Sequence, residues 1–316
     1  MKDRIITGTV LALTLLLVIW SRVLTPYIFD FFMGAFTIVA IIEVARVLEK
    51  RQIVVNTLVL GCYPAIFFVG LAIGLANKLG YIYYFAYVLL SMVAVFILNF
   101  VLTLCMKNTT NREKERYGIY SSDVEYAFQK AMNSELVLIY PGLLGCLMFV
   151  VNHFMEFNSI SAGLLGQFDI LSTFIIVLLF VITIFTDTFA LIVGSFIGGK
   201  KLCPRISPKK TISGAVGGLI FATLAGMVTF YIFYLFPEFK ELLAVWDIAV
   251  WQIVVISFVA SMMGQIGDLA ASMLKRSSRV KDYGTLLPGH GGVMDRIDGL
   301  LFVIPVVVLA MFILVL

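Results

Sequence analysis

Nine long apolar runs dominate the sequence and leave few folds open to it. About 20 helical residues, at 1.5 Å rise each, cross the roughly 30 Å hydrocarbon core of a bilayer. Backbone groups in lipid must pair within the chain, so runs of this length are typical of membrane-spanning helices. We therefore predict an all-α, polytopic integral membrane protein with about nine transmembrane helices, in which residues 1–316 form a single membrane domain. The runs are residues 5–20, 27–47, 53–76, 81–106, 136–151, 170–195, 211–236, 246–266 and 299–316.

Composition supports this class and excludes several others. Hydrophobic residues make up 61% of the chain and charged residues 13%, whereas soluble domains have about 45–50% and about 25%. These values exclude a soluble enzyme, a disordered chain and a free nucleic-acid binder. The four cysteines form no CxxC pair, which excludes a disulfide framework and a zinc site of the common spacing.

The basic residues predict the topology. If the runs alternate in direction and the N-terminus is cytoplasmic, all of the 23 basic residues except Arg22, Lys78 and Lys240 lie on the cytoplasmic side. This asymmetry agrees with the positive-inside rule and favours a multi-pass protein of the inner cell membrane. The longest polar stretches, 107–135, 198–210 and 272–298, lie on that same side, so we expect an active site that faces the cytoplasm. The first of them mixes both signs of charge and is interpreted as an amphipathic segment along the headgroups.

Two features near the sixth run indicate a charged site. Asp187 lies inside an apolar run, where a carboxylate costs about 2.5–3.5 kcal/mol at the bilayer centre on insertion scales. It should face the protein interior as a site residue or, alternatively, as a hydrogen-bonded structural one. Ser207, Lys209, Lys210 and Thr211 follow, just before a predicted helix whose N-terminus would attract an anion. The alternative for the two lysines is an ordinary topology signal.

The stretch 265–298 is the most informative. Asp268, Ser272 and Lys275 are spaced i, i+4, i+7 and share one helix face. Asp295 and Asp298, spaced i, i+3, share another face if the last helix has begun by then. Carboxylates beside cations suit a magnesium–polyphosphate site, because Mg²⁺ takes one or two carboxylates and completes its shell with phosphate oxygens and water.

A glycine-rich turn precedes these last aspartates. Gly289, Gly291 and Gly292 would let the backbone approach a phosphate closely. His290, taken alone, is interpreted as a turn residue. The surrounding cations are Arg276, Lys281 and Arg296. Taken one at a time, each could be a topology signal or part of a surface ion pair. A topology signal, however, requires neither aspartates nor glycines at fixed spacing, so the complete pattern favours a functional site.

The complete pattern resembles the defining motif of the phosphatidate cytidylyltransferase (CDP-diacylglycerol synthase) family. The 187–211 stretch is similar to that family's second motif, except that Leu191 and Ser213 stand where tyrosine and glutamate are common. Both motifs lie within residues 181–316, whereas residues 1–180 resemble the family in hydropathy alone. The matching residues of the long motif are Ser272-x2-Lys275-Arg276-x4-Lys281-Asp282-x-Gly284-x3-Pro288-x-His290-Gly291-Gly292-x2-Asp295-Arg296-x-Asp298.

The resemblance implies a membrane nucleotidyltransferase that condenses CTP with phosphatidic acid to give CDP-diacylglycerol and pyrophosphate. It implies Mg²⁺, leaving a second cation open, a homodimer, and no nucleic acid. We predict metal binding by Asp268 and Asp295, with Asp187 and Asp298 as lesser candidates, and catalytic roles for Asp268, Asp295, Lys275 and Arg296. The predicted substrate-binding residues are Ser207, Lys209, Lys210, Thr211, Ser272, Arg276, Lys281, Asp282, Gly289, His290, Gly291 and Gly292.

Two other functions stay open from the sequence. One keeps the chemistry and changes the lipid acceptor to an archaeal ether lipid or a polyprenol. The other is a transporter for an anionic phosphorylated solute, which interrupted helices and Asp187 would suit. The absence of an inverted repeat and the gathering of charge on one side disfavour the transporter.

Overall fold

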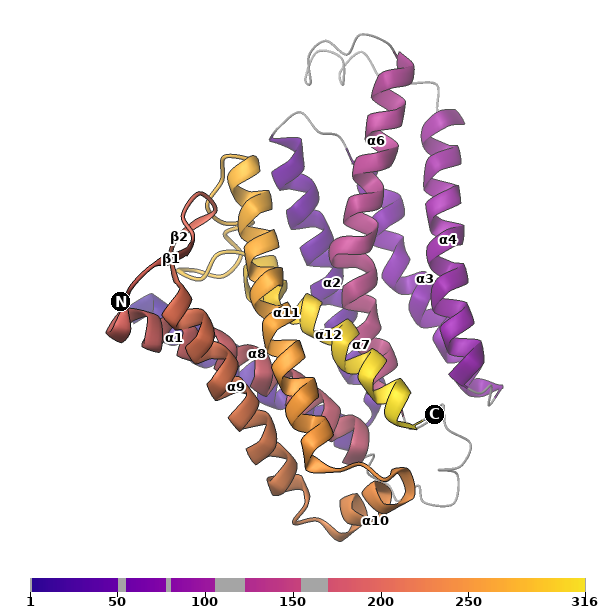
Figure 1. Cartoon of the computed structure of the whole chain (residues 1–316). Coiled ribbons are helices and arrows are strands. Elements are labelled where there is room, and N and C mark those ends of the chain that lie inside the picture. Colours follow the sequence, from indigo (N-terminus) through magenta and orange to yellow (C-terminus); the bar gives the residue numbers. More distant parts are fainter. Residues whose placement is uncertain (1, 51–54, 78–80, 106–122, 155–169, 316) are drawn as a thin grey trace.

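The computed structural model describes residues 2–50, 55–77, 81–105, 123–154 and 170–315. Helices make up nearly all of this part of the chain (Figure 1). The elements are α1 (Lys2–Trp20), η1 (Ser21–Val23), α2 (Pro26–Glu49), α3 (Thr57–Ala76), α4 (Tyr81–Cys105), α6 (Asp123–Val137), η2 (Leu138–Leu143), α7 (Leu144–Asn152), α8 (Ile170–Ile197), β1 (Lys201–Cys203), β2 (Ser207–Thr211), α9 (Ile212–Phe233), α10 (Pro237–Trp246), α11 (Val250–Ser277) and α12 (Met294–Val315).

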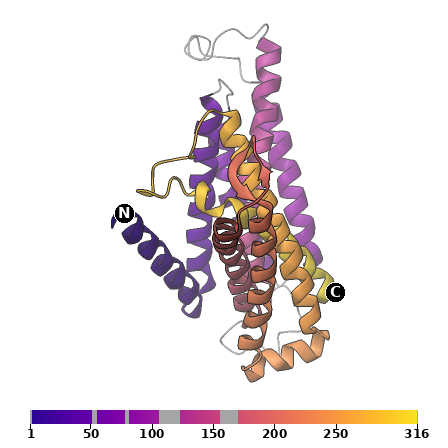
Figure 2. The ribbon, with the colours of Figure 1, turned by 60° about the vertical axis from the view of Figure 1, so that its left-hand side comes forward.

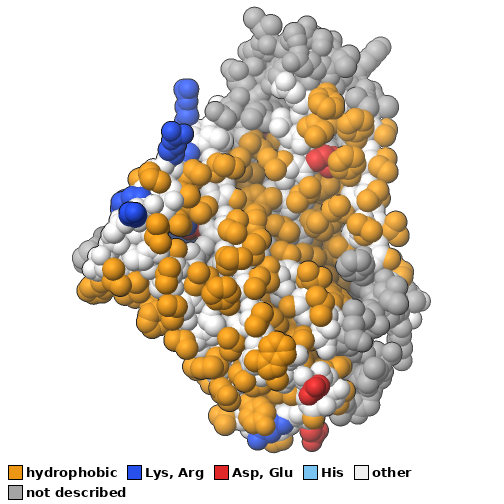
Figure 3. Space-filling view, in the orientation of Figure 1, with side chains coloured by type: hydrophobic (Ala, Val, Ile, Leu, Met, Phe, Trp, Pro, Cys, Tyr) orange, Lys and Arg blue, Asp and Glu red, His pale blue; other side chains and the backbone are white. Residues whose placement is uncertain are grey.

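The helices confirm the predicted fold class. Within the described residues, eight helices are long and apolar enough to cross a membrane, and α6, η2 and α7 together form one of them, Phe128–Asn152. The first predicted span corresponds to α1, whose apolar part, Thr7–Trp20, is shorter. Figure 2 shows α1 standing apart from the other helices. On the face in Figure 3, most of the coloured side chains of the described residues are hydrophobic, as expected for a bundle surrounded by lipid.

Polar segments gather at the two ends of the bundle. In Figure 1, β1, β2 and the segment between α11 and α12 lie toward one end, and the short helix α10 lies at the other. The strands β1 and β2 pair antiparallel, with Lys201 opposite Thr211. The helices extend beyond the apolar runs at the first of these ends, because α11 continues to Ser277 and α12 already begins at Met294.

Helices α8 and α9 pack very closely because glycines line their contact. A Cβ placed on Gly194 would lie 3.3 Å from the Cα of Gly214 and 2.8 Å from the hydroxyl oxygen of Thr211. Small residues let helix backbones approach one another in a membrane. This contact fixes the C-terminal half of α8, which carries Asp187, against the start of α9.

One local prediction, the amphipathic segment over 107–135, is wrong in its last part. Residues 106–122 lie outside the described part, but Asp123–Val137 forms helix α6, which runs beside α4 in Figure 1, and from Phe128 onward it belongs to a helix long and apolar enough to cross a membrane. Its Glu135 is buried, and the carboxylate accepts a hydrogen bond of 2.7 Å from Asn99 of α4. A hydrogen bond of this kind lowers the free-energy cost of burying a polar group inside the bundle. Charged residues in this stretch therefore did not show that the helix lies at the surface.

Candidate active site

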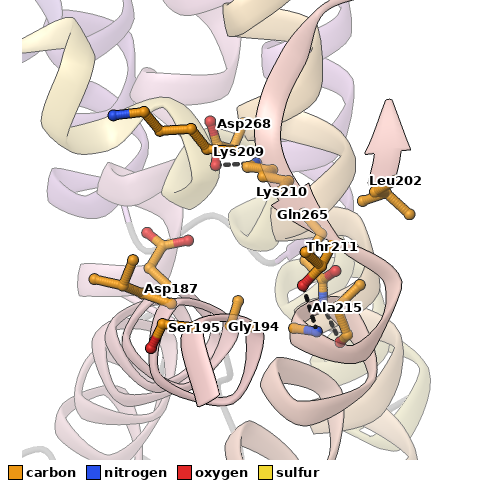
Figure 4. A pocket seen from close by; sticks show the side chains of 13 residues that line it. Asp187, Gly194, Ser195, Leu202, Lys209, Lys210, Thr211, Ala215, Gln265 and Asp268 are labelled. Atoms are coloured by element: carbon orange, nitrogen blue, oxygen red, sulfur yellow. Dashed lines mark hydrogen bonds and ion pairs between the residues drawn. The ribbon is translucent and has the colours of Figure 1, made fainter. Parts of the chain in front are cut away.

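A pocket of about 390 Å³ lies between α8, β2, α9 and α11. Asp187 of α8, Lys209 and Lys210 of β2 and Asp268 of α11 are its charged lining residues. Figure 4 shows Asp187 and Asp268 on opposite walls, with Lys210 beside Asp268. Three segments that are far apart in the sequence therefore meet at one pocket, as the sequence motifs predicted for a phosphate site.

The pair formed by Lys210 and Asp268 is the centre of this pocket. The Lys210 ammonium donates a hydrogen bond to Oδ2 of Asp268, and the Ser272 hydroxyl donates to Oδ1 at 3.4 Å. The side chains of Lys210 and Asp268 are 29% and 25% exposed, so both stay accessible from the pocket. Asp187 lies within electrostatic range of Asp268, Lys210 and Arg296. The pocket thus presents carboxylates and an ammonium group to the same space.

The N-terminus of α9 opens beside these groups. Thr211 is its N-cap, with extended backbone, and its side-chain oxygen accepts a hydrogen bond of 3.1 Å from the backbone N–H of Gly214. Both residues line the pocket, which confirms the predicted helix start after the lysines. Ser213 donates to the carbonyl of Gly198 and so closes the turn from α8 to α9.

The Thr211 cap gives a first testable prediction. Replacing Thr211 by Ala should lower the free energy of unfolding by about 1 kcal/mol, because the Gly214 N–H loses its side-chain acceptor. Thr211→Ser keeps the oxygen and should retain most of the stability. Thermal unfolding of the purified protein in detergent measures both, and equal midpoints for the Ala variant and the native protein would contradict the capping role.

A second charged cluster joins α11 to α12. The ammonium of Lys275 lies 2.7 Å from Oδ1 of Asp295 and 3.9 Å from Oδ2 of Asp298. All three side chains are at most 12% exposed. The shared helix faces predicted from the spacings are therefore present, since Asp295 and Asp298 turn toward the same lysine. Burial raises the pKa of Tyr283, whose phenol donates to the Ala271 carbonyl at 3.1 Å and whose ring lies under Lys275.

Asp295 also organises the loop before α12. Its Oδ2 accepts hydrogen bonds from the backbone N–H groups of Tyr283, at 2.8 Å, and Gly292, at 2.9 Å. Gly291 has a φ of 82°, and a Cβ there would lie 2.7 Å from that same oxygen. Both carboxylate oxygens of Asp295 thus have partners within the protein. Its hydrogen bonds to the loop are part of the structure, whereas metal binding by Asp295 stays a prediction.

The remaining predicted residues lie around the pocket without lining it. Arg276 donates from Nε to the carbonyl of Ile206 at 3.4 Å, which ties the β1–β2 hairpin to α11. Arg296 donates to the carbonyl of His290 at 3.1 Å, and the His290 N–H closes a turn onto Leu287 at 2.8 Å. Ser207, Lys281, Asp282 and Gly289 are likewise absent from the pocket lining.

Two residues of this region were missed from the sequence. Tyr140, in η2, is buried and lies within electrostatic range of Asp268, Asp295 and Asp298. Glu43, in α2, is buried and contacts the loop before α12. The signal that could have found Glu43 is the one used for Asp187, because it is an acid within an apolar run.

The described residues fit a divalent cation only together with a substrate. No group of three or more His, Cys, Asp or Glu side chains in the described ranges is arranged to hold a metal ion by itself. Mg²⁺ usually needs only one or two carboxylates beside phosphate oxygens and water. Asp268 and Asp187 face the pocket, and Asp298 lies within electrostatic range of both. This donor set suits a magnesium ion that arrives with a polyphosphate.

Comparison with known proteins decides the family. The model of the cytidylyltransferase family matches residues 2–314. The chain belongs to the cytidylyltransferase family. The phosphatidate cytidylyltransferases of Staphylococcus saprophyticus, S. epidermidis and S. aureus are 44%, 42% and 40% identical to it over 126 residues. Each of these alignments covers 40% of this chain and 44% of the relative. The chain therefore matches less than half of the relatives' length.

Proposed function

We propose that this protein is a phosphatidate cytidylyltransferase, which transfers the cytidylyl group of CTP to phosphatidic acid and releases pyrophosphate. The observation that carries the proposal is the Lys210–Asp268 pair facing Asp187 across a pocket at the N-terminus of α9. Family membership and the names of the staphylococcal relatives support the choice of reaction.

In the proposed reaction, an oxygen of the lipid phosphate attacks the α-phosphorus of CTP. The new P–O bond forms as the bond to the bridging oxygen breaks, and its electron pair leaves with pyrophosphate. Both reactants are anions, so charge neutralisation and positioning should provide most of the rate enhancement. Lys209, Lys210 and the free N–H groups at the start of α9 supply positive charge to the pocket. A lipid phosphate is already ionised near pH 7, so the reaction needs no strong base.

We propose that Asp268 holds Mg²⁺, with Asp187, Asp295 and Asp298 as further ligands or as hydrogen-bond acceptors around it. A bound Mg²⁺ supplies Lewis-acid polarisation and a template for the two phosphates. Lys210 can exchange its hydrogen bond with Asp268 for one with a phosphate oxygen, because the pair is partly exposed to the pocket. Lys275 stays with its two aspartates and holds α12 in place.

We propose that the pocket also opens toward the lipid. Supporting this, Leu191 lines the pocket and is 73% exposed on α8, as expected of an apolar side chain at an opening that faces lipid. We propose that phosphatidic acid enters here from the inner leaflet, that CTP enters from the cytoplasm, and that the enzyme acts as a homodimer in the inner cell membrane. The excess of basic residues on the predicted cytoplasmic side, where the polar stretches of the site also lie, supports this orientation.

The test uses the purified protein in liposomes with CTP labelled at the α-phosphate. Label should enter the lipid fraction with phosphatidic acid, and pyrophosphate should appear in equal amount. Preferential labelling of an ether-linked analogue or of a polyprenol would reassign the acceptor. Uptake of a phosphorylated solute into the liposomes without pyrophosphate release would replace the enzyme by a transporter.

Metal removal gives a second prediction. EDTA should reduce turnover to background, because two anions would then meet without a divalent cation, and added Mg²⁺ should restore it. EDTA saturated with Mg²⁺ beforehand is the matched control. Full turnover after dialysis against EDTA would contradict the metal assignment to Asp268.

A further inference from the structure

Glu43 is a buried acid in the C-terminal third of α2, far from the motifs along the sequence. It is only 4% exposed, and a carboxylate in such a place requires hydrogen-bond donors to offset its lost hydration. The donors are backbone groups 250 residues or more away along the chain. Val293 N–H donates to Oε1 at 3.1 Å, and Met294 N–H donates to Oε2 at 2.8 Å.

These two donors belong to the start of α12, which begins at Met294. The first N–H groups of a helix have no partner within it, and a carboxylate placed there also interacts favourably with the helix dipole. Side chains that cap a helix usually come from its own N-terminus. Here the cap comes from α2, so Glu43 ties the N-terminal half of the chain to the first turn of α12.

The loop before α12 is shaped around the same carboxylate. Gly284 and Gly292 both pack directly on Glu43, and a Cβ on either residue would overlap its carboxylate. On its other side, the loop is held by Asp295 through the N–H groups of Tyr283 and Gly292. Two carboxylates, Asp295 of α12 and Glu43 of α2, therefore hold the loop that carries the motif glycines from both sides. We call this pair of carboxylates the clasp.

We propose that Glu43 is a positioning residue of the active site. It does not line the pocket. By fixing the first turn of α12, it sets the place of Asp295, Arg296 and Asp298 against Lys275. The kinetic consequence rests on the proposed function, whereas the hold on the loop does not.

The experiment compares Glu43→Gln with a matched control, Glu49→Gln. Glutamine keeps the size of the side chain, but its amide nitrogen cannot accept a hydrogen bond from an N–H. Glu49 ends the same helix, and the described residues show no hydrogen bond or ion pair between it and the loop. Amide hydrogen exchange of the full-length protein in detergent is followed for peptides covering 284–296. Exchange there should be at least about tenfold faster in Glu43→Gln and unchanged in Glu49→Gln.

Kinetics separate positioning from general stability. For Glu43→Gln we expect kcat to fall about 10- to 100-fold, the KM values to stay within about threefold, and exchange in the other helices to stay native. A fall in activity that only follows a smaller folded fraction would overturn the positioning role. If the native protein makes no CDP-lipid but the loop exchanges faster in Glu43→Gln, the proposed reaction fails while the clasp stands.

A second pair of variants keeps the inference testable if Glu43→Gln does not fold. Gly292→Ala should speed loop exchange because its Cβ meets the Glu43 carboxylate. The same change in a Glu43→Ala background should have a smaller effect, since the obstructing carboxylate is gone. Equal effects in both backgrounds, or rapid exchange of Val293 and Met294 in the native protein, would overturn the clasp.

Discussion

Replacing Asp268 by Asn is expected to lower kcat for CDP-lipid formation at least about 100-fold and to leave the protein folded in the membrane. The change removes the charge that would hold a divalent cation and pairs with Lys210 in the pocket. Asparagine preserves the volume, and the site is partly exposed, so little stability should be lost. Formation of labelled lipid under saturating CTP measures the effect.

The matched control is Asp247→Asn. Asp247 caps α10 in a left-handed conformation that Asn also tolerates, and α10 lies at the opposite end of the bundle (Figure 1). The control should keep native turnover. Turnover of Asp268→Asn within twofold of the native protein would remove Asp268 from the metal site.

Replacing Lys275 by Ala should have the largest effect on stability, a loss of about 3 kcal/mol or more. Its side chain is 12% exposed, and its ammonium forms ion pairs with Asp295, whose side chain is 5% exposed, and with Asp298. Removing it leaves two buried carboxylates without this cation between α11 and α12. Thermal or denaturant unfolding in detergent measures the loss, with Lys201→Ala, an exposed residue of β1, as the control.

A double variant tests the cause. Lys275→Ala combined with Asp295→Asn removes one buried charge of each sign and should recover part of the lost stability, while activity stays low. If the double variant is no more stable than the single one, charge imbalance is not the reason for the loss.

The sequence predicted those parts of the site that lie within single helices. Spacing placed Asp268, Ser272 and Lys275 on one face because four residues make about one helical turn, and α11 carries them so. The start of α9 after the lysines was likewise predictable from the change in hydropathy at Thr211. The family resemblance added the reaction, which spacing alone does not contain.

Contacts between distant segments were not predictable in the same way. The hydrogen bonds from Val293 and Met294 to Glu43 depend on how α2 packs beside α12, and no local pattern encodes that packing. The error over 123–135 has a similar origin, since Glu135 finds its partner Asn99 only once α4 and α6 lie together. A single sequence shows that a buried acid needs a partner but does not show which one.

The length of α11 sets the depth at which the proposed reaction would take place. Its 28 residues span about 42 Å, whereas the hydrocarbon core is about 30 Å thick. Asp268 lies about 27 Å along this axis from Val250, and Lys275 about 37 Å. If the hydrocarbon begins at Val250, the acid would stand near its opposite edge and the lysine beyond it, at the level of lipid glycerol and phosphate. In the proposed reaction, a two-chain lipid could then react with its tails still in the leaflet, and neither reactant nor product would have to bear the roughly 0.8 kcal/mol per CH₂ that extraction into water costs.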